Sequence, residues 1–140
     1  DFWILLPATS SVAEMRSSGE ITAFHAHIYY GTKCGWFSKP CPKRREIAAS
    51  LQNFLIMYEV KNPNTIKVGR MHDQPVGPHT QPMLEIVIEP EAYSEVFKIL
   101  ILNHQDLPIL FHPVTGDDVD DHTLLATWLG EKLPLNIDKL

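Results

Sequence analysis

The sequence is poor in positive charge and contains no long apolar run. Its 140 residues include 12 lysines and arginines against 17 acids, which gives a formal net charge of −5. Nucleic-acid binding normally requires a broad basic surface that neutralises phosphates. The only basic cluster is Lys43, Arg44 and Arg45, which we expect to begin a solvated helix. We therefore expect no nucleic-acid partner.

The apolar segment from Phe2 to Leu6 is too short to cross a membrane, which takes about 20 residues in a helix. It also lacks the basic region that opens a signal peptide. We therefore expect a cytoplasmic protein without membrane contacts. Residues 1–20 are expected to form an N-terminal arm. Residues 21–140 are expected to form one domain, since the length and the 44% hydrophobic content suit a single core.

Cysteine is also scarce, with Cys34 and Cys41 the only two. Their spacing matches neither a zinc C-x-x-C pair nor a thioredoxin motif. A disulfide between them is geometrically possible, but we expect two free thiols. The sequence also lacks G-x-S-x-G, P-loop, G-x-G-x-x-G and H-E-x-x-H motifs, so serine-based acyl transfer and nucleotide binding have no local support.

The apolar pattern from residue 21 onward predicts strands alternating with helices. Strands are predicted at Phe24–Tyr30, Thr65–Met71, Met83–Glu89 and Pro108–His112. Apolar stripes at helical spacing are found from Ile47 to Tyr58 and from Tyr93 to Leu100, and a short helix is predicted at Asp121–Leu129 with Gly130 as its cap.

This order predicts an α+β fold of the ferredoxin-like βαββαβ type. We expect a four-stranded antiparallel sheet with two helices on one face, plus the short C-terminal helix. The opposite face of the sheet then stays open. A partner subunit, the C-terminal segment or a ligand must cover it.

Seven histidines carry most of the functional information: His25, His27, His72, His79, His104, His112 and His122. His25 and His27 are two residues apart on a predicted strand, so both point to the same face together with Tyr29. Ala26 and Ile28 point to the other face, where the helices are expected to pack. Two such imidazoles can converge on one metal, or one can bind while the other transfers protons.

The other histidines fall at loops and element ends. Pro75, Gly77 and Pro78 stiffen the loop before His79 and fix its direction. His112 ends the fourth strand and is expected near His25 if that strand lies beside the first. His122 opens the last predicted helix, where nearby aspartates can act as caps. The alternative is that some of these are ordinary surface histidines.

Three segments together resemble the DOPA 4,5-dioxygenase family of fungi and bacteria. They are a His-x-His-x-Tyr strand at His25–Tyr30, an HDxPVGPH loop at His72–His79 and an HPxTGDDxxDH segment at His112–His122. A closing AxWLG fits Ala126–Gly130, and the resemblance runs from Phe24 to Leu135. The sequence departs from the family at His104, where arginine is frequent, and at Thr80, where proline is frequent.

The resemblance implies extradiol cleavage of a catechol such as L-DOPA by O2, at a non-haem Fe(II) centre for which zinc can substitute. On this basis His27, His79 and His112 are predicted to be metal ligands, and His25, His122 and Tyr29 catalytic residues. His72 and His104 are predicted to contact substrate, and the protein is expected to be a homodimer. The alternatives are a non-catalytic dimeric module that binds a metal or ligand, and a monooxygenase on the same scaffold.

Overall fold

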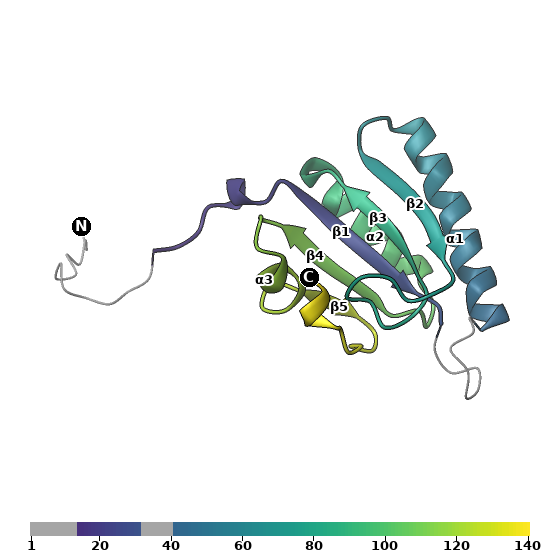
Figure 1. Cartoon of the computed structure of the whole chain (residues 1–140). Coiled ribbons are helices and arrows are strands. Elements are labelled where there is room, and N and C mark those ends of the chain that lie inside the picture. Colours follow the sequence, from purple (N-terminus) through teal and green to yellow (C-terminus); the bar gives the residue numbers. More distant parts are fainter. Residues whose placement is uncertain (1–13, 32–40) are drawn as a thin grey trace.

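Alternating side chains along the strands build a sheet with one apolar face and one face rich in histidine. The computed structural model describes residues 14–31 and 41–140 (Figure 1). The strands are β1 Ala23–Tyr29, β2 Ile66–His72, β3 Met83–Ile88, β4 Ile109–Val114 and β5 Thr127–Leu129. They form one antiparallel sheet in the order β2-β3-β1-β4-β5.

Two main helices cover the apolar face: α1 (Pro42–Lys61) and α2 (Tyr93–Asn103). Pro42 occupies the first turn of α1, where the missing N–H costs nothing. A short 3-10 helix, Pro90–Ala92, leads into α2. Ala26 and Ile28 of β1 are fully buried in one core with Leu55 of α1 and Leu100 of α2. The predicted direction of these two β1 side chains is thereby confirmed.

The C-terminal part of the fold differs from the prediction. The helix expected at Asp121–Leu129 is wrong: α3 covers only Asp118–His122, and Thr127–Leu129 forms β5 instead. β5 pairs with β4, so the sheet has five strands rather than four. After α3 the chain turns, and the backbone groups of β5 bond to β4 instead of continuing a helix. Gly130 is therefore not a helix cap but a residue with φ of 73° just after β5.

The same C-terminal segment covers the second face of the sheet. Leu133 is buried against Tyr29, Met83 and Leu110. His79 forms an isolated bridge with Leu135, and the Asn136 N–H donates to the Pro78 carbonyl at 2.8 Å. Figure 1 shows α3, β5 and the C-terminus gathered on the side of the sheet away from α2. The C-terminal segment, one of the three covers considered, thus lies on this face.

A bulge in β2 bends the strand beside β3. The pairing shifts between Val68 and Met71, so two residues of β2 face one of β3. A Cβ at Gly69 would lie 2.8 Å from the Glu85 carbonyl oxygen, which explains the glycine there. The bulge therefore lets the two backbones approach each other at Glu85.

Cys41, the residue before α1, is disulfide-bonded, so the expectation of a free thiol is wrong for this cysteine. Cys34 lies outside the described residues. Within residues 14–31 and 41–140, no helix has both the length and the apolar character needed to cross a membrane.

Candidate active site

Five histidines gather on the second face of the sheet, from two strands, one loop and one short helix. His25 and His27 come from β1, and His112 comes from β4, directly opposite His25 in the register. The predicted approach of His112 to His25 is confirmed, with ring centroids 5.0 Å apart. The loop after β2 supplies His79, and α3 supplies His122.

His27 lies at the centre of this group. Its ring is 4.1 Å from that of His79 and 5.2 Å from that of His112, centroid to centroid. The Nε2 atoms of His27 and His112 are 3.1 Å apart. His27, His79 and His112 are buried, with 2%, 5% and 3% of their surfaces exposed. The C-terminal segment folds the His79 loop onto the sheet, which is why His79 lies closer to the cluster than strand order alone suggests.

Hydrogen bonds at Nδ1 fix several of the rings. His112 Nδ1–H donates to the Pro113 carbonyl at 2.9 Å, and His122 Nδ1–H donates to the Asp118 carbonyl at 2.7 Å. A carbonyl oxygen only accepts, so both rings carry their proton at Nδ1 and present an Nε2 lone pair. That is the form of imidazole that ligates a metal.

Tyr29 continues the face beyond His27, as predicted. Its hydroxyl lies 2.6 Å from His79 Nδ1, and its ring stacks on Trp128 with centroids 5.8 Å apart. The side chain is fully buried, and burial raises the pKa of its phenol. Tyr29 therefore stays protonated at neutral pH and holds the His79 ring in place.

Asp121 holds α3 against the end of β4. Its buried carboxylate accepts from the Thr115 backbone N–H at 2.9 Å and from the Thr115 hydroxyl at 2.5 Å. The Asp117 side chain caps α3 by accepting from the Asp120 N–H. His122 follows Asp121 directly, and its ring lies 4.0 Å from that of His112, centroid to centroid. The hydrogen bonds of Asp117 and Asp121 therefore hold α3 in the position that brings His122 next to His112.

Burial and the neighbouring rings lower the pKa values of His27, His79 and His112 and keep these three imidazoles neutral. Burial lowers the pKa of His79 to about 4, and the neighbouring His122 and His112 add to this effect. Burial also lowers the pKa of His112 to about 4, against an opposing contribution from its bond to Pro113. The pKa of His27 is well below its ordinary value, chiefly through burial. Neutral imidazoles are the form that binds metals.

The cluster offers two overlapping sets of ligands for a metal ion. One atom each of His25, His27 and His112 lie within 4.8 Å of one another, and so do atoms of His27, His79 and His122. His27 belongs to both sets. Imidazole nitrogens bind metals at about 2.0–2.1 Å, so two neighbouring ligands lie about 3 Å apart. The His27–His112 separation matches that value, and the donor set therefore fits a metal.

The remaining predicted residues lie at or beyond the edge of this group. His72 ends β2 on the same face and is close enough to His79 to depress its pKa. His104 follows α2, where its Nδ1–H donates to the Leu107 carbonyl at 2.8 Å. The structure thus places His104 at the turn between α2 and β4 rather than in the histidine group.

Glu85 is a member of this face that the prediction missed. It pairs with His27 in the register of β1 and β3, and its carboxylate oxygens lie 3.8 Å from His25 Nδ1 and 4.0 Å from His27 Nδ1. The signal was present in the sequence. The predicted strand Met83–Glu89 places Leu84, Ile86 and Ile88 on one face, so Glu85 had to share the other with the histidines.

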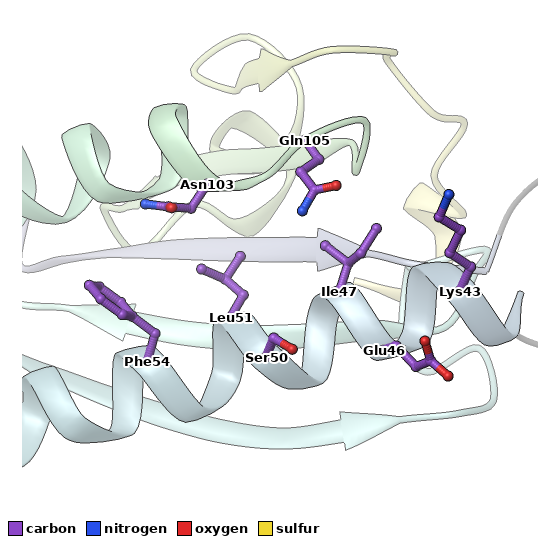
Figure 2. Close-up of a pocket in the computed structure, with 8 residues that line it drawn as sticks. All are labelled: Lys43, Glu46, Ile47, Ser50, Leu51, Phe54, Asn103 and Gln105. Carbon is purple, nitrogen blue, oxygen red and sulfur yellow. The ribbon is translucent and has the colours of Figure 1, made fainter.

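A separate pocket of about 450 Å³ lies on the helix layer, between α1 and the end of α2. Figure 2 shows its lining side chains, among them Lys43 and Phe54 of α1 and Asn103 of α2. None of the seven histidines lines it. The chemistry of the chain is therefore concentrated away from this hollow, on the opposite face of the sheet.

Two known proteins are similar to this chain in sequence. DOPA 4,5-dioxygenase from Amanita muscaria is 29% identical over 122 residues, which are 86% of this chain and 50% of that protein. An uncharacterized 21.2 kDa protein from Botryotinia fuckeliana is 30% identical over 132 residues, covering 89% of this chain and 66% of that protein. The chain thus spans half to two thirds of the length of these relatives.

A solved structure has a similar fold. It is a candidate dioxygenase from Nostoc punctiforme, with a TM-score of 0.71 and 33% identity, and the match covers 89% of this chain and 95% of that one. Residues 24–139 also match the Dopa 4,5-dioxygenase family, a range that contains all seven histidines. The chain therefore belongs to the Dopa 4,5-dioxygenase family.

Proposed function

We propose that the chain is an extradiol ring-cleaving dioxygenase that opens a catechol such as L-DOPA with O2, using a histidine-bound non-haem metal. The observation that carries the proposal is the buried His27, which belongs to two sets of possible metal ligands. Family membership and the named activity of the Amanita muscaria relative support the same reaction class. The fold we propose is ferredoxin-like, with β5 added at one edge.

The metal in this proposal is Fe(II), with zinc able to occupy the same ligands. His27, His79 and His112 would hold it; His27 and His112 belong to one of the two ligand sets, and His27 and His79 to the other. Fe(II) supplies Lewis acidity toward the catechol hydroxyls and the redox capacity to activate O2. The low pKa values of the three proposed ligands leave their nitrogens free of competing protons near neutral pH.

The less buried histidines suit proton transfer and substrate contact. His25 keeps 28% of its side chain exposed, and His122 is also partly exposed, so both are accessible to a catechol at the cluster. Either imidazole could accept a hydroxyl proton from the substrate and return one later. Tyr29 would hold His79 in position, and His72 would contact the substrate at the end of β2. Substrate contact by His104 and the formation of a homodimer stay predictions.

Oxygen consumption by the Fe(II)-loaded protein tests the proposal. Anaerobically purified protein is given DOPA, caffeate and protocatechuate, and O2 uptake, product mass and absorbance are followed together. Ring cleavage gives a yellow product that contains both oxygen atoms of ¹⁸O₂, whereas a monooxygenase adds one. The zinc-loaded protein is the matched control and should consume no oxygen. Stoichiometric iron without oxygen uptake on any catechol would contradict the proposal and favour a binding module.

A further inference from the structure

Glu85 is a charged residue in the middle of an apolar strand. The other residues of β3 are Met83, Leu84, Ile86, Val87 and Ile88. β3 is an interior strand, between β2 and β1. Glu85 stands directly opposite His27, and its side chain is 34% exposed, so it borders the histidine group without being sealed inside it. A charged side chain without a function at such a position would only destabilise the sheet.

One ring nitrogen of His27 lacks a hydrogen bond on this face. Its Nδ1 is buried and has no hydrogen-bond partner among the described residues. Its Nε2 faces His112 Nε2, at the separation of two metal ligands. A neutral imidazole that ligates through Nε2 carries its proton on Nδ1, and that proton requires an acceptor.

The two neighbouring rings already have such acceptors. His112 and His122 each use a backbone carbonyl, at 2.9 Å and 2.7 Å. His27 Nδ1 makes no such bond to a backbone carbonyl of the described residues. An acidic group is close by: Glu85 Oε2 is 4.0 Å from His27 Nδ1, and Glu85 Oε1 is 3.8 Å from His25 Nδ1.

We propose that Glu85 positions His27: its carboxylate accepts the Nδ1–H of His27, so that the Nε2 lone pair points to the metal. The inference rests on the proposed metal site. A shift of about 1 Å would bring the carboxylate to hydrogen-bonding distance. The flexible glutamate side chain can make this shift without moving the backbone. Carboxylate partners of this kind orient metal-ligating histidines and strengthen their binding.

Co(II) titration of four purified proteins tests this role. They are the unaltered chain, Glu85→Leu, Glu85→Gln and the control Glu89→Gln, which changes an exposed glutamate just beyond the same strand. Glu85→Leu removes the acceptor, and we expect about 10- to 100-fold weaker Co(II) binding. Glu85→Gln keeps an acceptor oxygen and should recover most of that loss. Glu89→Gln should bind as the unaltered chain does, and circular dichroism confirms that each variant is folded.

A second readout follows the proton itself. In the Zn(II)-loaded, ¹⁵N-histidine-labelled protein, the His27 Nδ1–H should give an exchange-protected, downfield proton signal. That signal should be lost or move upfield in Glu85→Leu and persist in Glu89→Gln. A general loss of folding would not move this one resonance selectively.

The outcomes separate the two proposals. If the unaltered chain binds no Co(II) or Zn(II), the metal site itself is wrong and the role of Glu85 falls with it. If the unaltered chain binds and Glu85→Leu binds equally well, the metal site stands and the inference is overturned. If both Glu85 variants lose all binding alike, Glu85 is itself a ligand, which also overturns the positioning role.

Discussion

The buried imidazoles of the cluster resist protonation, and this ties the stability of the metal-free protein to pH. His79 and His112 have native pKa values of about 4, against an ordinary value of 6.5. Between these values the unfolded chain binds more protons than the native one. The free energy of unfolding therefore falls as the pH is lowered from 6.5 toward 4, and each unit of pKa difference is worth about 1.4 kcal/mol. His27 contributes in the same direction.

Urea denaturation of the metal-free protein at several pH values between 7 and 4.5 measures this dependence. We expect the midpoint to be constant above pH 7 and to fall below 6.5. His79→Gln should have a shallower slope, because one of the depressed groups is removed. A slope that is flat through this range would show that the histidines are not held neutral by burial.

Tyr29 offers a second test at the scale of a single residue. Tyr29→Phe removes the hydroxyl that pairs with His79 Nδ1 and leaves a buried polar atom without a partner. We expect a loss of about 1–3 kcal/mol in the free energy of unfolding, measured by urea denaturation. Tyr93→Phe is the control, because Tyr93 packs against Phe24 and Phe97 without a hydrogen bond among the described residues. Equal effects of the two substitutions would contradict the pairing.

At the scale of elements, α3 depends on one side chain. Asp121 is the only buried residue of α3, and both of its carboxylate oxygens accept bonds from Thr115. Asp121→Asn turns an NH2 group toward one of these donors. We expect a loss of about 2 kcal/mol in the free energy of unfolding, together with weaker metal binding, because His122 follows directly.

The control for this prediction is Asp118→Asn, on the exposed side of the same helix. Its side chain is outside the Thr115 contact, so chemical denaturation should give a value within about 0.5 kcal/mol of the unaltered protein. If Asp118→Asn is as damaging as Asp121→Asn, the net charge of the segment and not the Thr115 contact stabilises α3.

At the scale of the whole molecule, the C-terminal segment closes the histidine face. Leu133 is buried against Tyr29 and Met83, beside the bridge between His79 and Leu135. Leu133→Ala leaves a cavity there, and we expect a loss of about 2–4 kcal/mol in thermal or urea unfolding. Leu124→Ala, at a leucine that is 79% exposed, should cost little. Similar losses for both leucines would mean that the segment does not pack as described.

Much of this arrangement is encoded locally. The alternation in β1 predicted that His25, His27 and Tyr29 share one face, and the order of elements predicted that His112 approaches His25. Helix stripes located α1 and α2 because their apolar faces repeat at helical spacing. These features depend on residues close in sequence or on the simplest pairing of successive elements.

The parts that the sequence did not predict depend on long-range contacts. β5 forms because Trp128 can pair with Leu110 at a free sheet edge, which overrides the helical tendency of residues 121–129. His79 joins the cluster because Asn136 and Leu135 hold its loop, and no local sequence pattern predicts that contact. The spacing of the histidines in the sequence also does not show which of them ligate the metal, since two ligand sets share His27.

The measurement that tests the central claim most directly is the metal content of two proteins, the unaltered chain and His27→Ala, after Fe(II) loading and removal of free metal. Elemental analysis should find one metal ion per chain in the unaltered protein. His27 belongs to both ligand sets, so His27→Ala should retain almost none while keeping its circular dichroism spectrum. Full metal content in folded His27→Ala would contradict the account, because the metal would then be bound elsewhere.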